Sequence, residues 1–196
     1  MGAAHPAKAP QEDEEGNSMK FSKKGDRGVT RLLGGQRIAK SGPRPEAYGT
    51  LDEASSALGI ARASAIRSKT KEILVSIQKD LIVLGAELAT AAEDLEKSPH
   101  QIKTEHVERL ERLIEDLQKD TVMGKEFILP GETVASAAID LGRSIVRRAE
   151  RMAVRLLQEK IITNGEVLRF LNRLADVLFT LARYEEGRAK PCIPSS

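Results

Sequence analysis

The segment GEVLRFLNRLADVLFTLARYEE, residues 165–186, decides the fold class of this chain. Its apolar side chains recur three and four residues apart, a spacing that places them on one face of an α-helix. The members of that face are Leu168, Leu171, Leu174, Ala175, Leu178 and Ala182. Asn164 and Gly165 precede the pattern and are typical of a helix N-terminus. The segment therefore predicts a long amphipathic helix whose apolar face is covered by other helices.

Four further segments show helical periodicity, and we predict helices over 45–67, 70–95, 104–119 and 133–159. Between Glu46 and Lys190 only Pro99 and Pro130 interrupt the chain, and both fall outside these helices. Only six of the 196 residues are aromatic, which favours helices over an aromatic-rich β-sandwich. The predicted fold class is all-α, with four or five long helices packed as a bundle.

The length of 196 residues suits one domain with short tails. Residues 1–19 are rich in Ala, Pro, Glu and Ser and predict a disordered N-terminal tail. We expect the domain over 20–190 and a C-terminal tail over 191–196. The N-terminus has no signal or transit pattern, and no apolar stretch is long enough to span a membrane, so we expect a cytoplasmic protein.

The sequence excludes several kinds of chemistry. One cysteine, Cys192, allows neither an intramolecular disulfide nor a cysteine-based metal site. None of the three histidines lies in an E-x-x-H motif, which argues against a di-iron bundle. No G-x-S-x-G or H-E-x-x-H motif is present. Any reaction would therefore depend on positioning and charge stabilisation rather than on a side-chain nucleophile.

The stretch 20–44 is rich in glycine and carries eight basic residues and one acidic residue. Its run SKKGDRGVT, residues 22–30, has the composition of a phosphate cradle, because glycine lets backbone N–H groups turn toward an anion and lysine and arginine supply charge. The Walker A spacing is absent. A solvated, flexible basic arm is the alternative interpretation. No helical period appears here, so we predict an extended loop with at most a short strand.

The predicted helix 133–159 carries an arginine stripe, formed by Arg143, Arg147, Arg151 and Arg155. Residues four apart drift by only about 40° around a helix, so these side chains lie on one slanting line. Little acid accompanies them, which favours a polyanion site over a solvated face with ion pairs. Glu150 follows Arg147 by three residues and can pair with it.

Two polar pairs each leave two interpretations open. Asp52 and Glu53 fall near the first turn of the first predicted helix, where negative charge complements the helix dipole. Alternatively, Asp52 pairs with an arginine of helix 133–159 and orients it. Asn172 and Asp176 lie one turn apart beside the apolar face of 165–186, where they make structural hydrogen bonds or contact a base or ribose.

Seven blocks, in order and at compatible spacing from about residue 20 to 186, resemble the PduO-type ATP:cob(I)alamin adenosyltransferases. They are Ser22-Lys-x-Gly-Asp-x-Gly-x-Thr30, Gly34-Gly35, Lys40, Glu46-Ala-Tyr-Gly-Thr-x-Asp-Glu53, Phe127-x-Leu-Pro-Gly131, Arg147-Arg-Ala-Glu-Arg151 and Phe170-Leu-Asn-Arg-Leu174. The resemblance implies an up-down, ferritin-like five-helix bundle, preceded by the glycine-rich basic loop, that forms a homotrimer with active sites between neighbouring subunits. It also implies transfer of the 5′-deoxyadenosyl group of ATP to cob(I)alamin, giving adenosylcobalamin and triphosphate, with Mg²⁺ as cofactor.

The resemblance implies roles for individual residues. It places the triphosphate against residues near the N-terminus, namely Ser22, Lys23, Lys24, Gly25, Thr30 and Lys40. It places Arg147 and Arg151 on the phosphates from across the interface and Asn172 on the nucleotide. Glu150 would contact the nucleotide or its Mg²⁺.

Two further residues complete the implied catalytic set with Arg147. Asp52 would form a salt bridge to Arg147. Phe127 would crowd the lower face of the corrin and keep the cobalt four-coordinate, which makes Co(II) easier to reduce because loss of an axial ligand lowers the orbital that takes the electron. The chain departs from the family pattern at Lys24, where a second threonine is frequent, and at Glu132, where a second glycine is common.

Two other function classes remain open on the residues alone. A helical nucleic-acid-binding protein would use the 20–44 stretch and the arginine stripe, but a sequence pI of about 8.7 and few aromatic residues argue against it. A purely structural bundle gives the glycine-rich basic loop no purpose. We therefore expect ATP and a reduced corrinoid as ligands, a flavoprotein reductase as a further partner, and neither a membrane nor a nucleic acid.

Overall fold

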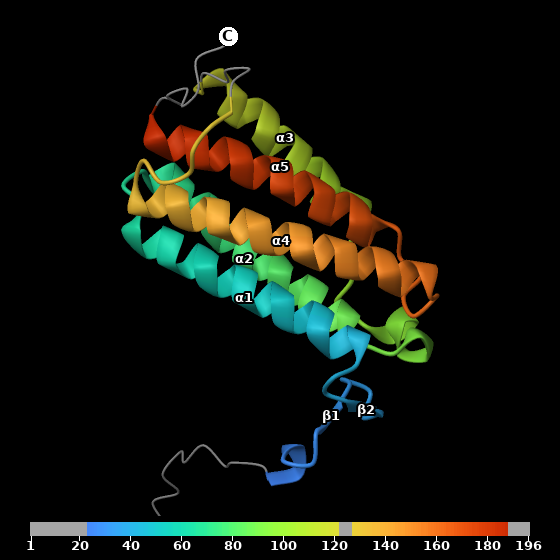
Figure 1. The fold of residues 1–196 in the computed structure, drawn as a ribbon. Coiled ribbons are helices and arrows are strands. Elements are labelled where there is room, and N and C mark those ends of the chain that lie inside the picture. The colour runs from blue at the N-terminus through green and yellow to red at the C-terminus, as the bar shows by residue number, and fades with distance from the viewer. Residues whose placement is uncertain (1–22, 122–126, 188–196) are drawn as a thin grey trace, which may run out of the picture.

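The computed structural model describes residues 23–121 and 127–187, and the predicted tails lie outside them. Five long helices make up most of the fold (Figure 1). They are α1 (Pro43–Ser64), α2 (Ser68–Leu88), α3 (Thr104–Lys119), α4 (Val134–Gln158) and α5 (Glu166–Glu186). The shorter elements are the 3₁₀ turn η1 (Lys23–Gly25), the strands β1 (Val29–Arg31) and β2 (Arg37–Ala39), and the 3₁₀ helix η2 (Ala92–Lys97). The predicted all-α bundle is confirmed.

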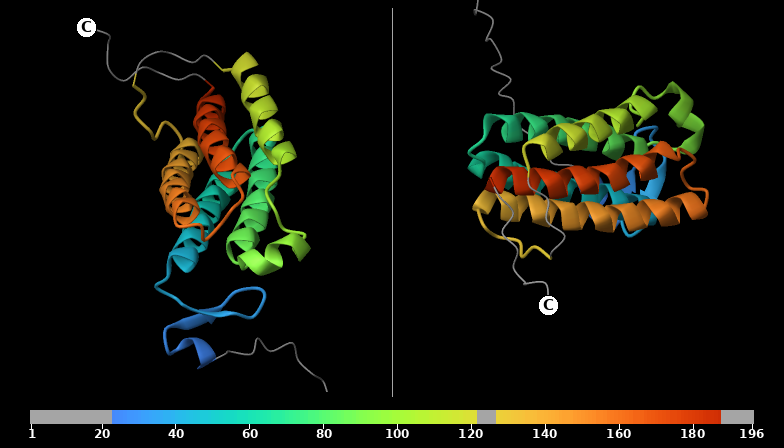
Figure 2. Two further views of the ribbon diagram at one scale, coloured as in Figure 1. Left: turned by 90° about the vertical axis from the view of Figure 1, so that its right-hand side faces the viewer. Right: turned by 90° about the horizontal axis from the view of Figure 1, so that it is seen from above.

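The helices enclose one apolar core. α1 packs beside α2 and α4, while α5 packs beside α4 and α3. Figure 2 shows α3 on the outside of the bundle, next to α5. The predicted inward face of 165–186 is buried, except that Leu168 is half-buried. Among the described helices, none has the length and hydropathy needed to cross a membrane.

A glycine lets α1 and α4 approach closely. Gly142 is buried on α4, and an added Cβ there would lie 2.6 Å from Cδ2 of Leu58 on α1. The carbonyl oxygen of Ala54, which is also buried on α1, would lie 3.8 Å from the same Cβ. The contact fixes the position of the arginine-bearing helix relative to α1.

Both ends of the first two predicted helices differ from the structure, which has α1 over Pro43–Ser64 and α2 over Ser68–Leu88, and one of these differences changes an interpretation. α1 begins at Pro43, because proline is tolerated at the first helical position. Asp52 and Glu53 consequently lie in the third turn, and the dipole acts only within the first. The first turn holds Glu46 instead. Complementing the helix dipole is therefore not the role of Asp52 or Glu53.

The second helix also ends earlier than the predicted 95. α2 stops at Leu88, and η2 follows after a short break. The Nη1 atom of Arg44 donates to the carbonyl oxygens of Leu88 (2.6 Å) and Thr90 (2.8 Å). A side chain distant in sequence thus satisfies the carbonyls that the helix end leaves without a partner.

A buried carboxylate ties three connections together at this end of the bundle. Glu87 accepts hydrogen bonds from the backbone N of Ile102 (2.6 Å) and from Nδ2 of Asn164 (2.8 Å). Oδ1 of Asn164 also accepts from the backbone N of Glu166 (3.0 Å), the first residue of α5, whose N-cap position is held by Gly165. Burial raises the pKa of Glu87, and the two hydrogen bonds oppose that shift.

Candidate active site

The basic stretch folds as a turn followed by a hairpin, rather than as the loop with at most one strand that the sequence predicts. β1 and β2 pair antiparallel, with Thr30 opposite Ile38. Before them, Gly28 N donates to Gly25 O (3.2 Å), and Gly28 has φ of +71°, which suits glycine. The backbone N of Lys40 closes the unit by donating to Gly28 O (2.8 Å).

This unit brings several predicted phosphate ligands together. Nζ of Lys40 would lie 3.0 Å from a Cβ added at Gly25, so its ammonium rests on the bare backbone of the turn. Lys23 begins the same turn and is exposed, and Thr30 follows on β1. Ser22 lies outside the described residues, as does the side chain of Lys24.

A second group of predicted residues meets where α4 and α5 touch. Oε1 of Glu150 accepts a hydrogen bond from Nδ2 of Asn172 at 3.2 Å. Glu150 therefore contacts Asn172, and no ion pair joins it to Arg147 in the described chain. Arg147 and Arg151 are exposed on the same helix, and Nη1 of Arg151 donates to the Arg147 carbonyl (2.9 Å). Among the described residues, neither guanidinium has a carboxylate within ion-pair distance.

The arginine stripe has three exposed members rather than the predicted four. Arg143 is half-buried, with its guanidinium carbon 5.2 Å from the ring centroid of Phe179 on α5. Its Nε is buried and has no hydrogen-bond partner among the described residues. Arg147, Arg151 and Arg155 remain exposed. Helical spacing alone does not distinguish these positions, because the difference comes from the aromatic ring on a neighbouring helix.

A buried ionic cluster, which the sequence analysis did not identify, joins α4 to α5. Nη2 of Arg183 lies 2.5 Å from Oδ2 of Asp140, which joins α5 to α4, and Nε lies 2.8 Å from Oε2 of Glu186. Burial raises the pKa of Asp140, and the Arg183 guanidinium opposes that shift. Burial by itself would lower the pKa of Arg183, but the hydrogen bonds to Glu186 and Asp140 hold that pKa above its usual value.

The predicted ion pair between Asp52 and Arg147 does not form within one chain. Glu53 and Arg148 form the ion pair that joins α1 to α4. Asp52 and Arg147 are both exposed. Asp52 precedes Glu53 and Arg147 precedes Arg148, so positions 53 and 148 are the ones that face each other between α1 and α4.

The predicted corrin contact lies at the other end of the bundle from the hairpin. Phe127 is 84% exposed just before α4, and the hairpin lies beside the far end of that helix (Figure 1). Leu129 and Val134 are exposed beside it in sequence, at 70% and 69%. Such a concentration of exposed apolar side chains is typical of a ligand or subunit contact. Within one chain, the predicted site residues thus lie in three separate groups: the hairpin unit, the α4–α5 group of Glu150 and Asn172 with its arginines, and the exposed apolar residues beside Phe127.

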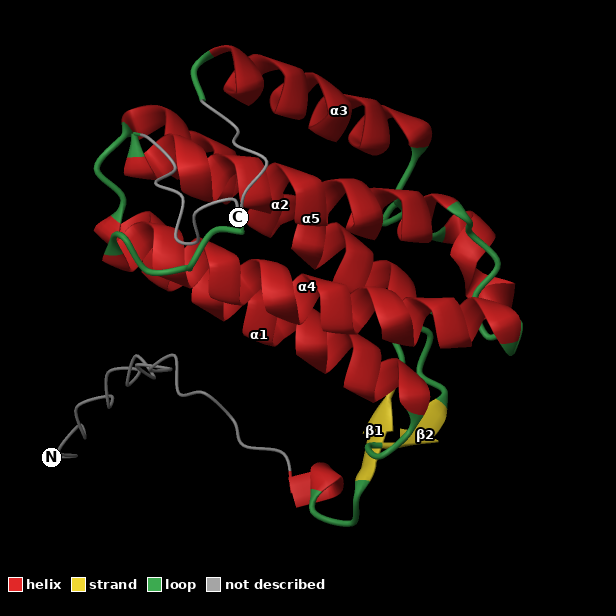
Figure 3. Ribbon diagram, turned by 45° about the horizontal axis from the view of Figure 1, so that its top comes forward, coloured by secondary structure: helices red, strands yellow, loops and turns green. Residues whose placement is uncertain are grey.

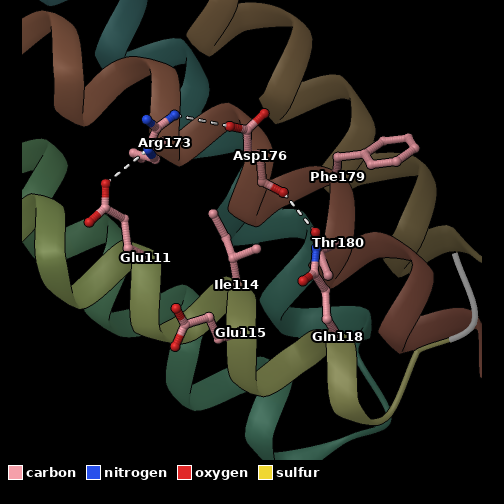
Figure 4. A pocket seen from close by; sticks show the side chains of 8 residues that line it. All are labelled: Glu111, Ile114, Glu115, Gln118, Arg173, Asp176, Phe179 and Thr180. Atoms are coloured by element: carbon pink, nitrogen blue, oxygen red, sulfur yellow. Dashed lines mark hydrogen bonds and ion pairs between the residues drawn. The ribbon is translucent and has the colours of Figure 1, made fainter.

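A groove of about 420 Å³ lies between α3 and α5 (Figure 4), and Nη1 of Arg173, which lines it, donates to Oδ1 of Asn172 at 3.0 Å. It is lined by Glu111, Ile114, Glu115, Gln118, Arg173, Asp176, Phe179 and Thr180. Within it, Nε of Arg173 lies 3.0 Å from Oε1 of Glu111. The predicted pair of Asn172 and Asp176 is thus divided, since Asn172 contacts α4 whereas Asp176 lines this groove. Asp176 is the one lining residue that the sequence analysis offered as a contact to a base or ribose.

Comparison with known proteins gives a consistent result. The family model described as Cobalamin adenosyltransferase matches residues 20–185. A corrinoid adenosyltransferase of Citrobacter freundii is 39% identical, over 88% of this chain and 97% of that protein. One from Bacillus subtilis is 37% identical, over 86% and 87%. A variant PduO-type ATP:corrinoid adenosyltransferase from Lactobacillus reuteri, complexed with cobalamin and ATP, has a TM-score of 0.75 and 38% identity, over 84% of this chain and 91% of that one. The chain belongs to the cobalamin adenosyltransferase family.

Proposed function

We propose that this protein transfers the 5′-deoxyadenosyl group of ATP to the cobalt of cob(I)alamin, giving adenosylcobalamin and triphosphate. The observation that carries the proposal is that its cationic side chains are clustered or lack carboxylate partners. Lys23 and Lys40 are gathered on a glycine turn, and Arg147 and Arg151 have no carboxylate partner in the described chain. A highly charged polyphosphate satisfies both groups.

The chemistry needs no nucleophile from the protein. The Co(I) centre of the corrinoid substrate attacks C5′ and supplies both electrons of the new Co–C bond. The bond between C5′ and the phosphate oxygen breaks, and its electron pair leaves with triphosphate. The protein has to hold C5′ near the cobalt and stabilise the charge of the leaving group, while the corrinoid supplies the reactive metal.

The hairpin unit binds the triphosphate in this scheme. Gly25 has no side chain, so the ammonium of Lys40 lies against its backbone, where a phosphate oxygen would meet the charge of Lys40 beside the turn. Lys23 adds charge and Thr30 a hydroxyl from the same unit. Ser22 and Lys24 join them by their match to the family motif.

The α4–α5 group binds the nucleotide from the other side. Arg147 and Arg151 neutralise phosphate charge, and the hydrogen bond between Glu150 and Asn172 holds both side chains toward the nucleotide. No cluster of three or more His, Cys, Asp or Glu side chains in the described chain could hold a metal. A single carboxylate still suits Mg²⁺, which commonly takes one or two carboxylates and completes its shell with phosphates and water. Glu150 would hold Mg²⁺ in that way, and the ion would neutralise phosphate charge.

We infer that the complete site forms between subunits of a homotrimer. Within one chain, no described hydrogen bond or ion pair joins the hairpin unit to Arg147 or Arg151. Asp52 is exposed and free to pair with Arg147 of the partner subunit. Such a pair would orient the arginine toward the phosphates.

Phe127 takes the corrin side of the site. Its exposed ring crowds the lower face of the corrin and keeps the cobalt four-coordinate, which eases reduction of Co(II). A flavoprotein reductase in the cytoplasm supplies the electron. Loss of activity from cob(II)alamin, but not from cob(I)alamin, is the expected result of removing this ring.

An anaerobic assay tests the proposal. Purified protein is mixed with chemically reduced cob(I)alamin, ATP and Mg²⁺, and the visible spectrum is followed for conversion to adenosylcobalamin. We expect conversion that requires both the protein and ATP. A folded protein that binds ATP but converts nothing would contradict the corrinoid assignment. Salt-dependent binding of DNA without ATP specificity would instead favour the nucleic-acid alternative.

A further inference from the structure

The tip of the hairpin is attached to the end of the bundle. The backbone N of Leu33 donates to the carbonyl of Ala89, just after α2, at 2.8 Å. Nε2 of Gln36 donates to Oδ2 of Asp94 in η2 at 2.6 Å. Leu32, between the strands, is only 7% exposed. The tip is therefore held by backbone, side-chain and apolar contacts together.

A buried arginine fixes the base of the hairpin to the same end of the bundle. Arg44 is 9% exposed, and its Nη1 bonds the carbonyls of Leu88 and Thr90. Its Nη2 donates to the carbonyl of Ile161, after α4, at 2.6 Å. One guanidinium thus links the start of α1 to the ends of α2 and α4.

The phosphate-binding turn has no comparable attachment of its own. The described hydrogen bonds of residues 23–28 all stay within the hairpin unit. η1 lies on the side of the strands away from the helices (Figure 3). Its position relative to the bundle is consequently set through the tip and base of the hairpin.

Gly34 makes the attachment at the tip possible. A Cβ added at this position would collide with the carboxylate of Asp94 and with the side-chain amide of Gln36, so alanine would force both side-chain ends to move and would disturb their hydrogen bond. Gly34 is not among the glycines with positive φ, so alanine can adopt its backbone conformation. Its requirement is for space alone.

From these contacts we infer that Asp94 and Arg44 are positioning residues for ATP: they hold the hairpin, and with it the triphosphate-binding turn, in place on the bundle. The inference rests on the proposed function, because it concerns the same nucleotide site. If the contacts are lost, the turn stays folded but occupies its binding position for a smaller fraction of the time. The apparent dissociation constant for ATP then rises in inverse proportion to that fraction.

Gly34→Ala is the direct test, since it displaces Asp94 without creating a cavity. By titration calorimetry with Mg²⁺ and ATP on the full-length protein, we expect binding weaker by about three- to tenfold. The kcat at saturating ATP and the KM for cob(I)alamin should match wild type, because the reacting groups are unchanged. Gly85→Ala is the matched control, as it lies on the adjacent helix α2 and its added Cβ meets no atom within 4 Å.

A double-variant cycle separates positioning from general damage. Asp94→Ala removes the carboxylate that Gly34→Ala displaces, so the double variant should bind ATP no more weakly than the worse single variant. Arg44→Lys keeps the charge and should bind ATP better than Arg44→Met, at equal KM for cob(I)alamin. ATP affinity unchanged in Gly34→Ala, or equal losses in kcat and in affinity for both substrates, would overturn the inference.

The ATP titration keeps this inference distinct from the proposed reaction. A wild-type protein that binds ATP but forms no adenosylcobalamin overturns the proposed transfer, and the variant dissociation constants still decide the role of the hairpin attachment. A wild-type protein that binds no ATP overturns both.

Discussion

Arg147→Ala is the substitution that tests the active-site assignment most directly. Arg147 is exposed and has no described carboxylate partner, so its removal should change the free energy of unfolding by no more than about 0.5 kcal/mol. A hydrogen bond between an arginine and a phosphate contributes about 1.5–3 kcal/mol. ATP binding or kcat/KM should therefore fall by about 10- to 100-fold.

The neighbouring arginine provides the control. Arg148 is also exposed on α4, but it pairs with Glu53, and a surface ion pair contributes at most about 1 kcal/mol. Arg148→Ala should keep ATP affinity near wild type. Both variants are compared by ATP titration, by steady-state adenosylation of cob(I)alamin and by urea unfolding. Unchanged ATP affinity in Arg147→Ala, or an equal loss in Arg148→Ala, would refute the assignment.

Three further substitutions test the corrin contact, the helix packing and the buried acid. Phe127→Ala should leave ATP binding intact and slow the reaction from cob(II)alamin; equal rates from that substrate would rule out the role. Gly142→Ala forces a methyl group against Leu58 and should lower the free energy of unfolding by about 1–3 kcal/mol, whereas a wild-type urea midpoint would contradict the packing. Burial raises the pKa of Glu87, so the folded state keeps the carboxyl proton to a higher pH than the unfolded state does. The contribution of Glu87 to stability therefore falls as the pH rises from about 4.5 through the raised pKa. The stability of wild type relative to Glu87→Gln should therefore decline as the pH rises above 4.5, and a pH-independent difference would contradict the raised pKa.

The helical bundle could be predicted because the required information is local. An apolar residue at every third or fourth position needs only its own segment to define a face, and the face of 165–186 is buried as predicted. Helix ends were less predictable. The end of α2 at Leu88 depends on Arg44, more than forty residues earlier, which bonds the carbonyls there.

The residues of the candidate site could be named from the sequence, but their arrangement in space could not. Glycine, lysine and arginine in a short stretch indicated an anion site, and the motifs indicated a family. The sequence carried no signal for the hydrogen bond between Glu150 and Asn172, because these residues lie on different helices and no helical period relates them. The cluster of Arg183 with Asp140 was missed for the same reason.

The sequence by itself determined the helices, the family and the residue types that we expect to bind phosphate, since periodicity and motif chemistry act over a few neighbouring residues. The tertiary structure decided which charged side chains are free. Arg143 lies against Phe179, Arg148 pairs with Glu53, and Arg147 remains exposed, although all three lie within six residues of one helix. The physical reason is that the partner of a helical side chain depends on where the neighbouring helices cross, and that crossing is set by the packing of the whole core.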